Sequence, residues 1–92
     1  MIKQTLADEI TLALDAYRQA AARANDAQSK EDYLRLVSIT ERVIAAMQAN
    51  DMAEVKLGVL GFSRQVSDSF ATQPLEFKAL AHKIAEVKKQ VV

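Results

Sequence analysis

Residues 51–70 read DMAEVKLGVLGFSRQVSDSF and form the most apolar run of the chain. Apolar side chains recur there at steps of three or four residues, so on a helix at ~100° per residue they share an arc of roughly 80°. This spacing predicts a helix over 51–70 with one core-facing stripe. Asp51 is predicted to cap it, because its carboxylate can accept hydrogen bonds from the free amides of the first turn. The stripe consists of Met52, Val55, Val59, Phe62, Val66 and Phe70.

Four residues inside this run do not fit a simple amphipathic helix. Leu57 and Leu60 project away from the stripe. Gly58 and Gly61, the two glycines of the chain, sit mid-helix, where each costs about 1 kcal/mol relative to alanine. They can allow close approach of a neighbouring backbone or form a hinge, or they can mark a kink or a break between two shorter helices. A strand over 55–62 is a further alternative, since a short apolar run is ambiguous by periodicity alone.

The segment before this run predicts a helix over 29–49 with an unusually wide apolar surface. Two stripes lie side by side and together cover about 160°, whereas a surface helix needs ~100°. This helix should therefore contact two neighbours, either two helices of its own bundle or one helix and a partner chain. The short turn at Asn50 and Asp51 predicts an antiparallel hairpin. The stripes are Tyr33, Val37, Thr40, Ile44 and Met47, and Leu36, Ile39, Val43 and Ala46.

Two further helices are predicted, over 3–24 and 74–90, and each has one apolar stripe. Leu12 lies off the first stripe, so we expect it on the surface. The stripes are Leu6, Ile10, Ala13, Leu14, Tyr17, Ala21 and Ala24 in the first of these helices, and Phe77, Leu80, Ala81, Ile84, Val87 and Val91 in the second.

Three residues indicate where these helices begin. Thr5 and Ser29 are each followed three residues later by an aspartate. This arrangement predicts N-caps for the helices over 3–24 and 29–49. Pro74 suits the first turn of the last helix, where its missing amide hydrogen has no partner in any case.

Together these patterns predict an all-α protein with one domain over residues 1–92. Its expected architecture is a small four-helix up-down bundle built around a central helical hairpin, and the glycines leave a kink or a break in the third helix as alternatives to one continuous helix. The helices are expected at about 3–24, 29–49, 51–70 and 74–90.

Composition narrows the classes of function. Twelve basic and twelve acidic residues leave the chain neutral, without the positive charge expected of a nucleic-acid binder or of a protein bound to a membrane surface. No apolar run approaches the ~20 residues of a membrane span. The first ten residues, MIKQTLADEI, carry acids where a signal peptide needs an apolar core, which predicts a cytoplasmic protein. The absence of cysteine excludes thiolate chemistry and disulfides.

Residues suited to catalysis are sparse. The single histidine, His82, is predicted on the outer side of the last helix. The segment LAHKIAEVKK, residues 80–89, resembles the histidine-phosphotransfer helix, which implies a phospho-accepting role for His82 in a phosphorelay or regulatory domain. It departs from that pattern because Ile84 and Ala85 stand where a small glycine normally follows the lysine. There is no Glu-x-x-His pair, so neither a metal nor any other cofactor is expected.

DNA binding is a lesser alternative. The turn at Asn50 is followed by Lys56, Arg64 and Gln65, which a recognition helix could use. The outward positions of this helix also include Leu57 and Leu60, which are poor contacts for phosphates or bases. Together with the neutral charge, this argues against nucleic acid as the partner.

Surplus apolar surface is the feature of the sequence that best indicates a function. Residues 39–55, ITERVIAAMQANDMAEV, resemble the hairpin of secretion and flagellar export chaperones, which implies binding of a partner protein. We therefore predict a non-enzymatic interaction module, such as an adaptor, a small chaperone or an inhibitor, whose partner is another protein or a second copy in a homodimer. The residues predicted to contact the partner are Leu36, Ile39, Val43, Leu57 and Leu60.

Overall fold

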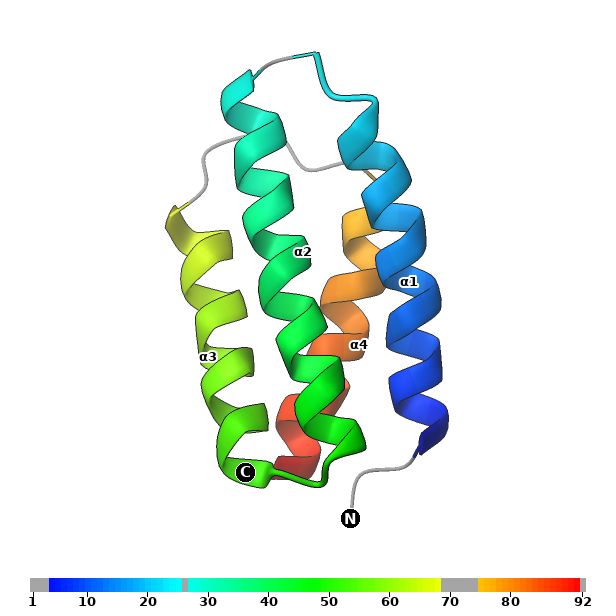
Figure 1. The fold of residues 1–92 in the computed structure, drawn as a ribbon, viewed down its shortest axis with the longest axis vertical. Coiled ribbons are helices and arrows are strands. Elements are labelled where there is room, and N and C mark those ends of the chain that lie inside the picture. Colours follow the sequence, from blue (N-terminus) through cyan, green and yellow to red (C-terminus); the bar gives the residue numbers. More distant parts are fainter. Residues whose placement is uncertain (1–3, 26, 69–74, 92) are drawn as a thin grey trace.

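Four antiparallel helices make up the computed structural model, which describes residues 4–25, 27–68 and 75–91 (Figure 1). They run alternately up and down, as the sequence predicts, and no strand occurs in the described ranges. The predicted helix limits at Lys3, Phe70 and Pro74 lie outside the described residues. The helices are α1 (Gln4–Ala22), α2 (Ala27–Gln48), α3 (Met52–Asp68) and α4 (Glu76–Val91).

Helix α3 continues through both glycines. Gly58 and Gly61 have helical backbone angles without a positive φ, and both lie inside the one helix. The strand alternative for residues 55–62 and the interpretation of a break between two shorter helices are therefore wrong. The core stripe of α3 holds the helix against its neighbours despite the low helix propensity of glycine, because tertiary burial outweighs propensity.

The turn between α2 and α3 ends one helix and begins the next. Asn50 adopts a left-handed conformation with a φ of 56°, which asparagine tolerates better than most residues. The backbone amide of Asn50 donates to the Met47 carbonyl at 3.1 Å, and that of Asp51 donates to the Ala46 carbonyl at 2.9 Å. This is the pairing of a Schellman motif. The Glu54 amide donates to the Asp51 carboxylate at 3.2 Å, which confirms Asp51 as the N-cap.

The other two predicted caps are wrong. Thr5 and Ser29 lie inside α1 and α2, which begin at Gln4 and Ala27. For α2, the residues before Ser29 favour helix. Ala27 is of the best helix-forming residue type, and the side-chain amide of Gln28 donates to the Asp32 carboxylate one turn later at 3.2 Å. These contacts extend the helix past the serine that the sequence pattern marks as its boundary.

The core follows the predicted stripes. Each helix packs against two neighbours in the order α1, α2, α3, α4 and back to α1, so α2 contacts α1 and α3. Both neighbours of α2 are thus helices of its own bundle, which accounts for its wide apolar surface. The large side chains with the least exposure are Ile10, Leu14 and Tyr17 of α1, Leu36 and Val43 of α2, Val55 of α3, and Leu80 and Val87 of α4.

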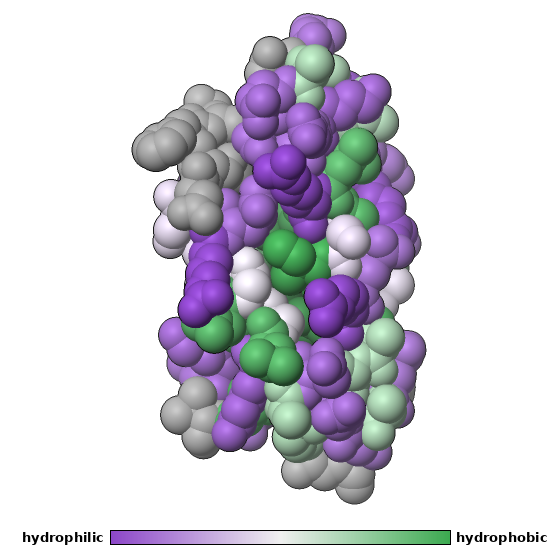
Figure 2. Space-filling view, turned by 60° about the vertical axis from the view of Figure 1, so that its left-hand side comes forward, coloured by the Kyte–Doolittle hydropathy of each residue, from purple (hydrophilic) through white to green (hydrophobic). Residues whose placement is uncertain are grey.

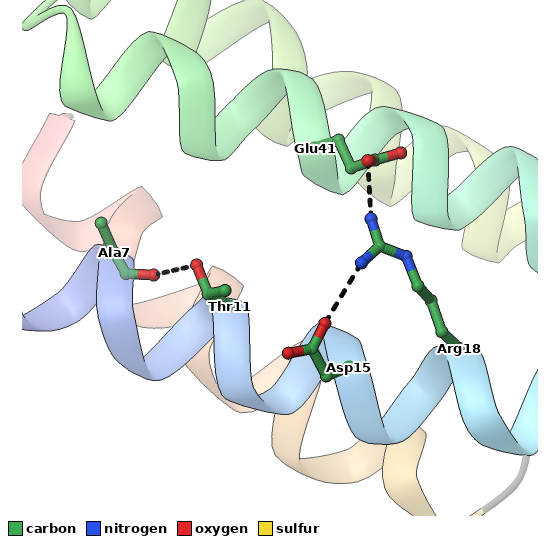
Figure 3. A network of polar contacts seen from close by, with 5 residues as sticks. All are labelled: Ala7, Thr11, Asp15, Arg18 and Glu41. Carbon is green, nitrogen blue, oxygen red and sulfur yellow. Dashed lines mark hydrogen bonds and ion pairs between the residues drawn. The ribbon is translucent and has the colours of Figure 1, made fainter.

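Ion pairs join the two helices at three of the four places where helices pack against each other. Figure 3 shows Arg18 of α1 donating to Glu41 of α2 at 2.6 Å and to Asp15 of its own helix at 3.1 Å. In the same view the Thr11 hydroxyl donates to the Ala7 carbonyl at 2.9 Å. Exposed pairs of this kind contribute ~0.2–1 kcal/mol each. The remaining interhelical pairs are Arg42–Glu54 at 3.6 Å, Lys83–Glu9 at 2.7 Å and Arg23–Glu76 at 3.2 Å.

The contact between α3 and α4 is the smallest of the four helix contacts. None of the ion pairs between described residues joins these two helices. This side of the bundle is therefore packed less extensively than the others and lacks their charge pairing.

Tyr17 lies at the centre of an aromatic cluster in the core. Its ring is 5.8 Å from that of Tyr33, edge to face, and 6.3 Å from that of Phe77. Burial raises the pKa of the Tyr17 hydroxyl above its ordinary value, and the nearby Tyr33 and Asp32 raise it further. The fold therefore favours the neutral form of this phenol.

We expect the stability of the protein to fall in alkaline solution through Tyr17. Above about pH 10 the phenol ionises in the unfolded chain but not in the folded one, so the unfolded state binds fewer protons and the free energy of unfolding decreases as the pH rises. Tyr17→Phe should remove this loss, which reaches up to about 1.4 kcal/mol per pH unit. Urea unfolding of both proteins between neutral and alkaline pH measures it. Parallel decreases in the two proteins would contradict the prediction.

Candidate functional site

The exposed side of α3 carries two leucines that take no part in the core. Val55 and Val59 are buried on the inner side of the helix, whereas Leu57 and Leu60 are 59% and 48% exposed on the outer side. Ala53, four residues before Leu57, is also exposed. Because residues three and four apart are neighbours on a helix surface, these side chains adjoin one another. We call Ala53, Leu57, Leu60 and the half-buried Gly61 the α3 patch.

Figure 2 shows the face of the molecule on which α3 comes forward. Apolar atoms gather in the middle of this face, and hydrophilic side chains surround them. Single exposed leucines are ordinary on protein surfaces, and Leu12 of α1 and Leu34 of α2 are examples. The α3 patch differs because two such leucines lie one turn apart on the same side of one helix.

Two of the five predicted contact residues are not on the surface. Leu36 and Val43 are almost completely buried in the core, and Val43 lies against Gly58 of α3. This corrects the prediction that they contact a partner, since they are inaccessible while the bundle is closed. Ile39 is half-buried at the edge of the core. Leu57 and Leu60 are exposed, as a contact surface requires.

Gly58 allows α2 and α3 to approach closely. A Cβ atom placed on Gly58 would lie 2.5 Å from Cγ2 of Val43, closer than real carbon contacts. A Cβ atom on Gly61 would meet Cγ2 of Ile39 at 3.7 Å, an ordinary van der Waals distance. Of the interpretations left open by the sequence, close approach thus holds at Gly58, while Gly61 has room for a side chain.

A groove of about 290 Å³ lies between α3 and α4, next to the patch. Leu60 belongs to both surfaces, so the groove and the patch are continuous. The sequence did not single out this groove, because periodicity along α3 cannot show which face of α4 lies opposite. Its lining residues are Lys56, Val59, Leu60 and Ser63 of α3, and Lys88 and Val91 of α4.

His82 is exposed on α4. Its Nε2 atom lies 3.3 Å from the Glu86 carboxylate one turn later, the spacing of an ordinary surface pair on a helix. Within residues 4–25, 27–68 and 75–91, no group of three or more histidine and carboxylate side chains could hold a metal ion. His82 therefore belongs to a network of surface charges, since Glu86 also lies 3.8 Å from Lys83.

No family model, curated protein or solved structure matches this chain. Among the helices that the structure describes, none combines the length and the apolar character needed to cross a bilayer. The feature of the described residues that indicates a function is therefore the surface of the bundle, and the α3 patch in particular.

Proposed function

We propose that the chain is a non-enzymatic protein-interaction module that binds a partner protein through the α3 patch. The observation that supports this proposal is the pair of exposed leucines, Leu57 and Leu60, one turn apart on a helix whose inner side is already buried in the core. Fully burying a leucine contributes ~1.5–3 kcal/mol, and since each of these two is about half exposed, a partner that covers both gains about the value of one leucine. An adaptor, a small chaperone or an inhibitor would all use the patch in this way.

The patch is tested by exchanging its leucines for serine. Leu57→Ser/Leu60→Ser should reduce the recovery of the partner by about tenfold or more, since 1.4 kcal/mol is a factor of ten in affinity. The fold should survive, because exposed substitutions change stability by about 0.5 kcal/mol or less. Affinity capture with quantitative mass spectrometry, with circular dichroism to check the fold, measures both effects.

A matched control exists on the other helices. Leu12→Ser/Leu34→Ser removes two leucines of similar exposure from α1 and α2, outside the patch. We expect this variant to retain the proteins that the unaltered chain captures. If both double variants retain the same proteins at the same level, the proposed function is wrong.

Self-association would make a second copy the partner. Light scattering over a range of concentrations distinguishes the two cases. A dimer that Leu57→Ser/Leu60→Ser converts to a monomer would identify the partner as the chain itself, whereas a monomer at all concentrations would leave the patch for a different protein.

A further inference from the structure

The α3–α4 groove has an apolar floor and a cationic rim. Val59, Leu60 and Val91 supply aliphatic surface, and the charged side chains of its lining are Lys56 on α3 and Lys88 on α4. Neither lysine forms an ion pair with any residue that the structure describes. Two like charges thus border one apolar surface without a neutralising group from the described part of the chain.

Other grooves of the bundle contrast with it. The groove between α1 and α2 includes Arg18 and Glu41, which pair at 2.6 Å. The groove between α2 and α3 includes Arg42 and Glu54, whose charged groups are 3.6 Å apart. In both, an ion pair within the chain joins the two helices and balances the charge. The α3–α4 groove alone among these three has cations on both sides.

The two helices that border this groove carry further cations. Arg64 of α3 and Lys78 and Lys89 of α4 are exposed, and they too form no ion pair within the described residues. On α1 and α2, Arg18 and Arg42 are paired, whereas Lys30 forms no ion pair with a described residue. An occupant with acidic side chains would therefore meet complementary potential here, which favours encounter and orients the partner.

We propose that the α3–α4 groove is the docking site for an amphipathic helix of a partner protein, one whose apolar stripe is flanked by acidic side chains. The inference rests on the proposed function and names the chemistry of the partner. The α3 part of the lining, from Lys56 to Ser63, spans two helical turns or about 10 Å. A helix laid along the groove would place its apolar stripe on Val59, Leu60 and Val91 and its carboxylates beside the two lysines.

The same charges disfavour a second copy as the occupant. A symmetric dimer brings identical surfaces together, so contact through this groove would place Lys56 and Lys88 of one copy near the same lysines of the other. Like charges facing each other across an interface oppose association. An acidic helix from a different protein can pair its carboxylates with the two lysines without this repulsion.

The test uses two synthetic helical peptides and the 92-residue chain. One peptide carries leucines at positions i, i+3, i+4 and i+7 with glutamates beside this stripe, and the other has lysines in place of the glutamates. Fluorescence anisotropy measures affinity, and amide chemical shifts in NMR spectra locate the site. We expect the acidic peptide to bind about tenfold or more tightly than the basic one, to shift residues 56–63 and 88–91, and to bind more weakly as salt is added.

Single charge reversals test the role of the two lysines and include a matched control. Lys56→Glu and Lys88→Glu should each weaken binding of the acidic peptide by about tenfold. Lys30→Glu makes the same charge change on α2, away from the groove, and should alter binding by less than about twofold. Equal binding of the two peptides, or unchanged binding by Lys56→Glu and Lys88→Glu, overturns the inference.

Other occupants give different results. A dimer that Lys88→Glu dissociates would overturn the inference in favour of a second copy, and binding of decanoate in the groove without binding of the acidic peptide would overturn it in favour of a small amphipathic anion. The proposed function fails separately: it requires that Leu57→Ser/Leu60→Ser lose the partner. If that variant loses the partner while Lys56→Glu and Lys88→Glu retain it, the patch binds a protein and the groove does not.

Discussion

Replacing Gly58 with alanine is expected to destabilise the protein, whereas the same replacement at Gly61 is expected to stabilise it. Both changes gain about 1 kcal/mol of helix propensity. At Gly58 the new methyl group would lie 2.5 Å from Cγ2 of Val43, and overpacking of this kind typically costs ~1–3 kcal/mol. Val43 is buried and β-branched, so its side chain has essentially one rotamer in a helix and cannot turn away.

Urea unfolding of the two variants measures the difference directly. Gly61→Ala should gain up to about 1 kcal/mol, because the new carbon meets Ile39 at an ordinary 3.7 Å. Gly58→Ala should lose up to about 2 kcal/mol. Adding Val43→Ala to Gly58→Ala tests the cause, since the two changes should be coupled when they relieve one contact. If Gly58→Ala proves as stable as Gly61→Ala, the close approach of α2 and α3 is not what requires glycine.

Ile10→Ala is expected to have the largest effect on stability among the changes considered. Ile10 of α1 is completely buried, so truncating it removes apolar burial and leaves a cavity that the packed core fills only in part. Such substitutions typically cost ~2–5 kcal/mol, a large part of the ~5–15 kcal/mol that stabilises an ordinary domain. Denaturant unfolding followed by circular dichroism gives the value.

Leu12 provides the matched control for this prediction. It lies two residues from Ile10 on the same helix but is 71% exposed, so Leu12→Ala should change the free energy of unfolding by no more than about 0.5 kcal/mol. The contrast tests the orientation of α1 in the bundle. Similar losses for the two variants would mean that α1 is rotated from the position described.

The proposed interface and the core differ in their response to substitution. Leu57 and Leu60 can be exchanged with little expected effect on folding, because both are exposed and lie outside the core cluster. Leu36 and Val43, which the sequence grouped with them, cannot be exchanged without opening a cavity. Substitutions in the α3 patch therefore separate binding from stability, whereas substitutions on the second stripe of α2 do not.

Most local features of the fold were determined by the sequence alone, although the caps predicted at Thr5 and Ser29 were wrong. Apolar spacing predicted four helices and their core stripes, and Leu12 was correctly expected on the surface. Asp51 was correctly identified as a cap, because its carboxylate acts on amides only three residues away. These features depend on contacts within one or two helical turns, so a single segment contains the information that specifies them.

Only the tertiary structure decided which surfaces face one another. Periodicity gave the width of the apolar surface of α2, but it did not show that the bundle buries Leu36 and Val43. It could not show that Gly58 meets Val43, or that Lys56 and Lys88 border one groove, because each pair joins residues far apart in the chain. The physical reason is that side-chain spacing determines the faces of a helix, whereas the packing of the whole bundle determines which of them remain exposed for a partner.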